Sequence, residues 1–382
     1  MCLGVVDHLP EDVISLLADL VRIPSVCGEE GKVAEFIAKW LTENGLPSEI
    51  LEVKPGRPNV LSRVKAEQEG PCLMLNGHMD TVAPGTGWEH DPFGAEIESD
   101  RMYGRGTVDM KSGLASMLLA LAECKHEGLP KKGEVILAAV VDEESFDLGS
   151  YALVQKLIMS DVDLAMISEA SDLNVVTAHR GRTVMQVVVH GKPAHSMWPT
   201  HGVSAIASAA NLVNAISELR SPTHPKMGRS TVNVLKIEGG QEEVMLVPDR
   251  CRIVIDRCLV PGHNSKDALE DLNAVIKKLG INAEASFIER ETPFCDPFEI
   301  PDDDKYVQLV VGAAAKALGS TPRISFHEGP CDSCILVNQG HVPTLEFGPS
   351  GGRLHESDEF VNLESVRKTT KVYKEVIRTL LS

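Results

Sequence analysis

Positive charge, long apolar runs and regularly spaced cysteines are all scarce in this chain of 382 residues. Lys and Arg number 37 against 55 Asp and Glu, which gives a formal net charge of −18. Nucleic-acid binding needs a basic surface, so this balance argues against a nucleic-acid partner. Apolar runs all fall short of the roughly 20 residues that a membrane helix needs, which argues against a membrane protein.

The N-terminal stretch MCLGVVDHLPED lacks a basic region followed by a long apolar segment, so we predict no signal peptide. Nine cysteines, an odd number, are scattered over the chain, which is typical of reduced thiols in a cytoplasm. Cys331 and Cys334 form a C-x-x-C, but zinc binding would require a second pair at matched spacing. We favour small buried residues near a helix start, with a redox pair as the alternative, and predict a cytoplasmic protein.

The length favours two domains, and the apolar pattern divides the chain in the same way. Strands alternate with helices over residues 1–180 and again over 294–382, which predicts an α/β domain with a mostly parallel sheet. Residues 181–293 instead predict an inserted α+β domain of about four strands and two helices. Helices are expected at 12–23, 32–44, 111–127, 151–158, 203–219, 265–279, 304–318 and 363–380. Strands are expected at 48–53, 59–64, 72–75, 134–141, 164–167, 183–190, 231–237, 252–260, 283–288, 323–326 and 344–347, with a hairpin at 95–103.

Acidic and imidazole side chains repeatedly follow the apolar strands. His78 and Asp80 end one strand, Glu143 and Glu144 follow the run ILAAVV, and Glu169 follows another strand. Ligands of open α/β sheets bind at the carboxyl ends of the strands, so these segments are expected to meet there. Unpaired carboxylates held together would repel one another, and divalent metals resolve this repulsion.

Two further residues complete the inventory for two metal ions, which would need one bridging carboxylate and two more ligands each. Asp109 lies in GRGTVDMKSG, and His355 follows a glycine-rich loop. Each residue also has an ordinary explanation when taken alone. Asp109 could cap a helix, Glu143 and Glu144 could lie in a solvated loop, and His355 could be a surface histidine. The repeated pattern is what favours the metal site.

At this point the sequence resembles a family, the M20-type co-catalytic zinc metallopeptidases and deacylases. The motifs that carry the resemblance run in order along nearly the whole chain: GHMDTV, GRGTVDMKSG, VVDEES, ISEAS, GKPAHSMWP, VPDRCRIVIDRCLVPG and FGPSGGRLHESDEFV. The family includes acetylornithine deacetylase, succinyl-diaminopimelate desuccinylase, aminoacylase and glutamate carboxypeptidase.

The resemblance implies a role for each candidate in the metal-binding domain. One metal would be bound by His78 and Glu169, the other by Glu144 and His355, and Asp109 would bridge them before a cis peptide bond. Glu143 would be the general base and then the general acid. Asp80 would accept the second N–H of the His78 imidazole and so fix its tautomer. The candidate site residues are therefore His78, Asp80, Asp109, Glu143, Glu144, Glu169 and His355.

The resemblance also implies that residues 181–293 form a lid and dimerisation domain. His195 would reach the site of the partner subunit as an oxyanion donor, and Asn233 and Arg257 match substrate-side positions. We therefore expect a homodimeric amidohydrolase with two zinc ions per subunit, cobalt or manganese being alternatives. The substrate would be an N-acyl amino acid, as for acetylornithine deacetylase or succinyl-diaminopimelate desuccinylase, or alternatively a short peptide, as for glutamate carboxypeptidase or a dipeptidase.

Two readings of other classes compete with this one. The segment GPSGG matches the G-x-S-x-G nucleophile elbow, which would make Ser350 the nucleophile of a serine hydrolase. That elbow needs a helix after the serine, and RLHESDEF lacks helical periodicity. A non-catalytic metal-binding protein is the second alternative, and the presence of Glu143 beside all five ligand candidates argues against it. The chain contains neither a G-x-x-x-x-G-K phosphate loop nor an HExxH motif.

Overall fold

A computed structural model describes residues 12–216, 219–242 and 244–382. The chain forms two compact units. Unit 1 comprises the N-terminal part up to Thr177 together with Ile300–Ser325 and Cys331–Ser382, and unit 2 comprises Ala178–Glu299 and Phe326–Pro330. Within the described ranges, no helix is both long and apolar enough to cross a membrane. The first eleven residues, on which the signal-peptide prediction rests, lie outside the described part.

Unit 1 is built on a mixed sheet whose centre is parallel. Strand order is β1-β2-β6-β3-β7-β17-β8, and the contiguous pairs β6–β3, β3–β7 and β7–β17 are parallel. The mixed α/β class with a mostly parallel sheet is therefore confirmed. The strands of this path are β1 (Glu49–Lys54), β2 (Arg57–Lys65), β3 (Gln68–His78), β6 (Lys132–Val140), β7 (Leu164–Ile167), β8 (Val175–His179) and β17 (Thr344–Glu346).

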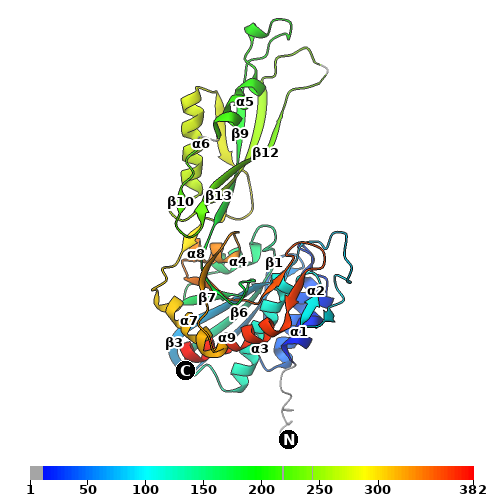
Figure 1. Cartoon of the computed structure of the whole chain (residues 1–382), viewed down its shortest axis with the longest axis vertical. Coiled ribbons are helices and arrows are strands. Elements are labelled where there is room, and N and C mark those ends of the chain that lie inside the picture. The colour runs from blue at the N-terminus through cyan, green and yellow to red at the C-terminus, as the bar shows by residue number, and fades with distance from the viewer. Residues whose placement is uncertain (1–11, 217–218, 243) are drawn as a thin grey trace. The chain divides into compact units, whose positions relative to one another are not determined.

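Helices cover the central strands, and Figure 1 shows them around the sheet. The helices are α1 (Val13–Arg22), α2 (Gly31–Glu43), α3 (Ser112–His126), α4 (Leu148–Gln155), α7 (Lys305–Leu318), α8 (Asp332–Asn338) and α9 (Leu363–Leu381). α3 and α9 pack on each other and on β3 and β6, while α8 packs on β7 and β17. The apolar runs of β6 and β7 are buried because layers of helix cover the parallel strands, as the unbroken hydrophobic pattern predicted.

A second, small antiparallel sheet in unit 1 joins segments that are far apart in the chain. Its order is β18-β19-β5-β4, and β5 pairs with β19 so that Tyr103 lies opposite Phe360. The bounds are β4 (Glu96–Glu98), β5 (Arg101–Tyr103), β18 (Gly351–Gly352) and β19 (Phe360–Asn362). The pairing sets the loop after β5, which carries Asp109, beside the loop between β18 and β19, which carries His355.

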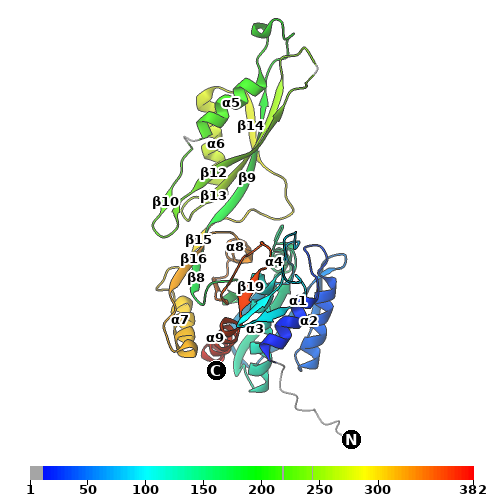
Figure 2. The ribbon, with the colours of Figure 1, turned by 45° about the vertical axis from the view of Figure 1, so that its right-hand side comes forward.

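Unit 2 is an antiparallel sheet with two helices on one face, as Figure 2 shows. Strand order is β12-β13-β9-β14, so β12 and β14 are the edge strands. The buried side chains of β9 and β13 form a core with α5 and α6. The sheet and its helices are β9 (Gly181–His190), α5 (Ala205–Ala215), β12 (Thr231–Gly239), β13 (Arg250–Leu259), α6 (Ser265–Leu279) and β14 (Ala283–Phe287). Outside this sheet, β10 (Thr223–His224) pairs with β11 (Gly228–Arg229), and β15 (Phe298–Glu299) and β16 (Ile324–His327) pair with β8.

Most predicted elements are present with ends shifted by a few residues, and the 95–103 hairpin is confirmed as β4 and β5. Sequence reasoning missed α8 and the strands β8, β10, β11, β15, β18 and β19. α8 starts at Asp332, directly after Cys331, whose thiol caps its N-terminus. Both Cys331 and Cys334 are buried, as favoured above, and neither forms a disulfide. The helix predicted for 203–219 is α5, which ends at Ala215, and residues 217–218 lie outside the described part.

Candidate metal centre

Three adjacent parallel strands deliver the first candidate residues to one edge of the sheet. His78 is the last residue of β3, Glu143 and Glu144 follow β6, and Glu169 follows β7. Since β3 lies between β6 and β7, these side chains approach one another from neighbouring strand ends. Parallel strands end at the same edge, which is where a ligand crevice is expected in open sheets.

The backbone around Glu169 approaches two other segments closely. A Cβ atom on Gly113 would lie 2.1 Å from the carbonyl oxygen of Ser168, and one on Gly348 would lie 2.0 Å from that of Glu169. Any side chain at either position would therefore displace the Ser168–Glu169 segment. The two glycines thus let α3 and the loop after β17 pack against the strand end that carries Glu169.

The first group of possible ligands consists of His78, Asp109 and Glu169. His78 Nε2 lies 3.2 Å from Asp109 Oδ1 and 3.3 Å from Glu169 Oε1. The ring is fully buried, and its other nitrogen, Nδ1, lies 2.9 Å from the backbone carbonyl oxygen of Asp80. The Nε2 lone pair is therefore directed at two carboxylates, which suits an imidazole that shares a cation with them.

The second group consists of His355, Asp109 and Glu144. His355 Nε2 lies 3.1 Å from Asp109 Oδ2 and 3.0 Å from Glu144 Oε2. Asp109 thus directs one oxygen at each histidine, and its carboxylate is common to both groups. Glu143 and Glu144 also offer ligand atoms within 4.8 Å of one another and of His78. The peptide bond from Asp109 to Met110 is cis, as the resemblance implied.

Asp80 contacts its neighbours differently from the expectation. The His78 Nδ1 nitrogen is closest to the backbone carbonyl of Asp80, while the Asp80 carboxylate lies 3.8 Å away. The carboxylate instead accepts the backbone N–H groups of Glu143 (3.3 Å) and Glu144 (3.1 Å). The carboxylate is engaged by these two amides because the chain turns directly after His78. Asp80 therefore links the histidine to the loop that carries both glutamates.

The turn before Glu143 is fixed by a buried ion-pair network. Asp142 has a left-handed backbone (φ +72°), and its Oδ1 lies 2.5 Å from Arg57 Nη2. The same guanidinium contacts Glu30 at 2.5 Å. Cys27, Glu30 and Asp142 also satisfy the spacing of a metal site, but Arg57 already supplies the cation there. We therefore assign this second cluster a role in holding the loop rather than in binding metal.

The centre contains more carboxylates than positive charges to balance them, and the pKa values of its residues reflect this. Burial raises the pKa of Glu143 well above its usual range, and burial likewise raises the pKa of Glu169 to about 7. Burial lowers the pKa of His78, but Glu169 and Asp109 outweigh it, so the net pKa is raised. Hydrogen bonds to Asp109 and Glu144 raise the pKa of His355 to about 10.

Burial raises the pKa of the two glutamates and nearby carboxylates raise the pKa of the two histidines, so the centre holds protons where its carboxylates lie close together. Divalent cations would replace those protons. The donor set fits two such ions, since each group offers one imidazole nitrogen, one Asp109 oxygen and one glutamate carboxylate. Nitrogen and carboxylate donors suit zinc and its neighbours in the first transition row.

The candidates in unit 2 lie in different environments. His195 is exposed, and its Nδ1 accepts the backbone N–H of Met197 at 3.2 Å. Its ring lies 5.2 Å from that of Trp198, which is also exposed. A backbone bridge between His195 and Leu246 ties this loop to the segment between β12 and β13.

Asn233 and Arg257 lie on opposite faces of the unit 2 sheet. Asn233 pairs with Asp256 and Val232 pairs with Arg257, and directly opposed residues of an antiparallel pair share a face. Asn233 is exposed, whereas Arg257 is buried on the helix-covered face and donates to the backbone carbonyl of Arg220. Within unit 2, the Asn233 side chain is therefore open to solvent, whereas that of Arg257 is enclosed by the sheet and its helices.

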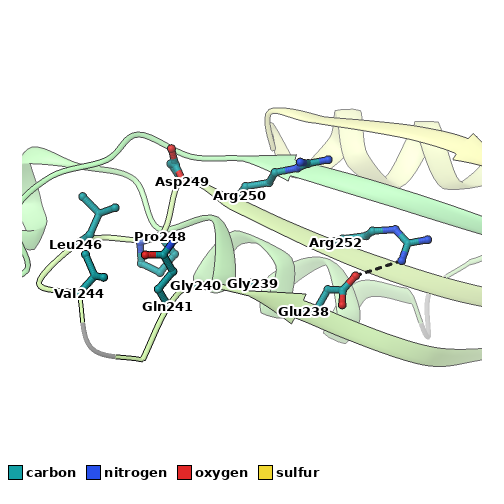
Figure 3. Close-up of a pocket in the computed structure, with 10 residues that line it drawn as sticks. All are labelled: Glu238, Gly239, Gly240, Gln241, Val244, Leu246, Pro248, Asp249, Arg250 and Arg252. Carbon is teal, nitrogen blue, oxygen red and sulfur yellow. Dashed lines mark hydrogen bonds and ion pairs between the residues drawn. The ribbon is translucent and has the colours of Figure 1, made fainter.

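A pocket of about 500 Å³ lies between the end of β12 and the start of β13. Figure 3 shows its lining, in which Glu238 and Arg252 form an ion pair of 3.2 Å. Leu246, which bridges to His195, also lines it. The pocket is thus next to the loop that carries the exposed histidine.

Ser350 does not stand in a nucleophile elbow. The residues that follow it form strand β18 rather than a helix, and its hydroxyl accepts the side-chain amide N–H of Asn362 at 2.9 Å. An elbow exposes its serine at a sharp turn between a strand and a helix. The local structure therefore removes the geometric basis for the serine hydrolase.

Several buried residues around the centre were missed by sequence reasoning. Arg57 and Glu30 lie outside the quoted motifs, and no local pattern marks them. Arg105 and Glu359 do lie inside the motifs GRGTVD and HESDEF, beside Asp109 and His355. These two residues could have been found from the sequence, because they carry opposite charges and each lies four residues from a candidate ligand in segments that were already expected to meet.

Comparisons with known proteins agree with this geometry. The family described as "Peptidase family M20/M25/M40" matches residues 74–379. A probable succinyl-diaminopimelate desuccinylase of Staphylococcus epidermidis is 26% identical, with 97% of this chain and 98% of that protein covered. The fold is similar to that of an aminopeptidase PepT from Bacillus cereus, with a TM-score of 0.79, 23% identity and coverage of 97% and 98%. It is also similar to a Bacillus subtilis protein described as a dinuclear metal binding peptidase, with a TM-score of 0.72, 16% identity and coverage of 97% of both chains.

The chain belongs to the M20/M25/M40 peptidase family, because the match extends over most of its length. Members of this family, its desuccinylases included, are metal-dependent amidohydrolases. The resemblance noted from the motifs, and with it the hydrolase class, is therefore confirmed.

Proposed function

We propose that the chain hydrolyses the amide bond of N-acyl amino acids at a centre of two divalent metal ions. One observation carries this proposal: the two oxygens of Asp109 lie 3.2 and 3.1 Å from the Nε2 atoms of His78 and His355. One ion would be held by His78, Glu169 and Asp109, and the other by Glu144, His355 and Asp109. When bound, the ions act as Lewis acids that polarise the substrate carbonyl and acidify water.

The protein's own groups perform the proton transfers. Glu143 accepts a proton from the attacking water and returns it to the amine that leaves, which requires a carboxylate near the ligands but not engaged as one. Asp80 accepts the backbone N–H of Glu143, and Arg57 holds Asp142 next to it. The base is therefore oriented from both sides. Desolvation also raises the pKa of Glu143 well above its usual range, which increases the proton affinity of this carboxylate.

The substrate class follows from the curated relatives, which are named succinyl-diaminopimelate desuccinylases. We propose an N-succinyl or N-acetyl amino acid with a free carboxylate, and zinc as the metal in preference to cobalt or manganese. The test is a panel of N-succinyl amino acids, N-acetyl amino acids and dipeptides, assayed with chelated protein that has been reloaded with each metal. Highest kcat/KM for an N-acyl substrate is expected. Preference for dipeptides would replace the deacylase with a peptidase, and full activity without metal would reject the metal centre.

We further propose a homodimer through unit 2, in which His195 of each subunit donates to the oxyanion in the site of the other. Support comes from β12, an edge strand of nine residues with the exposed apolar side chains Leu235 (50%) and Ile237 (49%). An exposed apolar edge strand is a template for pairing with another chain. The exposed His195 has room for a contact outside its own unit.

The dimer is tested by light scattering of Ile237→Lys, with Ile50→Lys as the matched control. Ile50 lies on β1, an edge strand of the other sheet, and is equally exposed at 51%. Ile237→Lys is expected to be monomeric and to lose activity, while Ile50→Lys remains dimeric. A dimeric and active Ile237→Lys protein would contradict pairing through β12.

A cytoplasmic location completes the proposal. None of the eight described cysteines forms a disulfide, which is typical of a reducing compartment.

A further inference from the structure

Two buried residues outside both ligand groups connect the segments that carry Asp109 and His355. Arg105 and Glu359 form an ion pair of 2.6 Å, with only 1% and 0% of their side chains exposed. Arg105 lies four residues before Asp109, and Glu359 lies four residues after His355. Burying a charge pair this completely is costly unless most of its remaining hydrogen-bonding capacity is used, and Arg105 Nε is the one buried side-chain atom of this pair without a partner among the described residues.

Glu359 uses that capacity on the backbone of the Asp109 loop. Its Oε1 accepts the N–H groups of Val108 (3.0 Å) and Asp109 (3.2 Å), and its Oε2 accepts that of Gly106 (3.1 Å). Its backbone carbonyl also accepts the N–H of Gly104 at 3.0 Å. One residue of the His355 segment therefore holds most of the turn that presents Asp109.

Arg105 makes the reciprocal contact. While Nη1 binds Glu359, Nη2 donates to the backbone carbonyl of Glu356 at 3.1 Å, and Glu356 directly follows His355. The guanidinium also lies 5.3 Å from the ring of Trp88. Its planar fork reaches two groups of the His355 loop at once, which a lysine ammonium does not reproduce.

We propose that Arg105 and Glu359 are positioning residues that set the separation of Asp109 and His355 and thereby create the second metal site. This inference rests on the proposed two-metal function. It predicts that loss of the pair lowers affinity for one ion, the one shared by Asp109, Glu144 and His355, more than for the other. Partners that orient ligands in this indirect way change metal affinity by about 10–100-fold.

The test measures zinc stoichiometry and affinity of the full chain, beginning with the wild type, for which two ions are expected. Glu359→Gln keeps the shape of the side chain, but its amide places N–H groups opposite backbone N–H groups that donate hydrogen bonds to the carboxylate in the wild type. We expect dialysed Glu359→Gln to retain about one ion and to regain activity as free zinc is raised about 10–100-fold. The matched control is Glu375→Gln, a buried carboxylate on α9 that is paired with Lys316 at 2.5 Å and should keep both ions.

A double variant separates positioning from general damage. His355→Ala removes the second site directly, so Glu359→Gln combined with His355→Ala should lose no more zinc than His355→Ala alone. A further loss would indicate a general defect of the unit and overturn the inference, as would two ions of wild-type affinity in Glu359→Gln. If Glu359→Gln fails to fold, Arg105→Lys provides the same test, because it keeps the charge but not the fork. A wild type with fewer than two ions would instead reject the proposed function itself.

Discussion

The candidate residues of unit 1 are held by their own unit, whereas the exposed histidine of unit 2 is not. His78 is fully buried and contacts Asp109, Glu169 and the backbone of Asp80. His195 is exposed and its ring nitrogen contacts only a neighbouring backbone amide among its hydrogen bonds in the described residues. A preorganised centre can be complete within one unit, but a solvated side chain gains a catalytic role only when a second surface excludes water around it. The candidate residues of unit 1 therefore contact one another within their own unit, whereas the role proposed for His195 requires a second surface.

The largest effect is expected where both groups of unit 1 depend on one residue. Asp109→Ala removes a carboxylate common to both groups, so both ions and measurable turnover should be lost. Asp80→Ala removes only the acceptor of two backbone amides and should lower metal affinity by about 10–100-fold. Metal analysis after dialysis, together with turnover at saturating zinc, distinguishes the two variants. Equal metal loss in both would mean that Asp109 is not shared.

Next in size is the proton-transfer role of Glu143. Glu143→Gln should keep both metals and the fold but lower kcat by about 10²–10⁴, because the amide neither accepts nor returns the proton. Glu134→Gln, on the other end of β6 and paired with Arg63 at 3.4 Å, is the control and should be active. Near-normal turnover of a metal-loaded Glu143→Gln protein would remove the residue from this role.

The third prediction tests whether His195 of one subunit acts in the site of the other. His195→Ala should lower kcat by about 10²–10³, the usual cost of an oxyanion donor, with metal content unchanged. Mixed dimers of His195→Ala and Glu143→Gln should regain partial activity, because one site then combines both intact residues. Heterodimers that stay as inactive as the parent homodimers would argue against supply across the interface. Normal activity of His195→Ala alone would remove the catalytic role.

The sequence predicted which strand ends of unit 1 lie together, because strand ends obey a simple geometric rule. His78, the Glu143–Glu144 pair and Glu169 each follow an apolar run, and parallel strands end at one edge. Asp109 and His355 were added for their residue types, and only the motif resemblance gave them roles, since their meeting depends on pairing of β5 with β19 over more than 250 positions. Local periodicity carries no information about such a distant pairing.

The parts that escaped prediction depend on side-chain direction and on charge compensation. Asp80 was expected to contact the imidazole through its carboxylate, but the turn after β3 brings its backbone carbonyl there instead. Asn233 and Arg257 came from two separate motifs, and motif matching gave no information on side-chain direction: the register of β12 and β13 places them on opposite faces of the sheet. Arg57 was not foreseen, because nothing in its surroundings in the sequence signals the buried Glu30 and Asp142 that it binds.

The smallest predicted effect concerns the pH dependence of unfolding in the metal-free protein, and it should appear in unit 1 alone. Burial raises the folded-state pKa of Glu169 to about 7 and that of Asp80 to about 6, both above their usual values. The folded state therefore binds more protons than the unfolded state, and stability falls as pH rises through this range. His355 contributes in the same direction. Asp109 and Glu144 raise its pKa from 6.5 to about 10 in the folded state, so the folded protein holds this proton to a higher pH than the unfolded chain does, and the stability that the proton gives is lost as pH rises.

Chelated protein should therefore melt at a lower temperature at pH 8.5 than at pH 5.5, by roughly 2–4 °C for each kcal/mol lost in a unit of this size. Bound divalent ions should reverse this pH dependence, so that the melting temperature rises with pH, since metal binding favours deprotonated ligands. The three tryptophans allow the units to be read separately: Trp40 and Trp88 lie in unit 1 and Trp198 in unit 2. The fluorescence of the Trp198→Phe variant then reports on unit 1 alone. If the melting temperature of this metal-free variant stays constant or rises with pH, the crowded carboxylates do not destabilise unit 1.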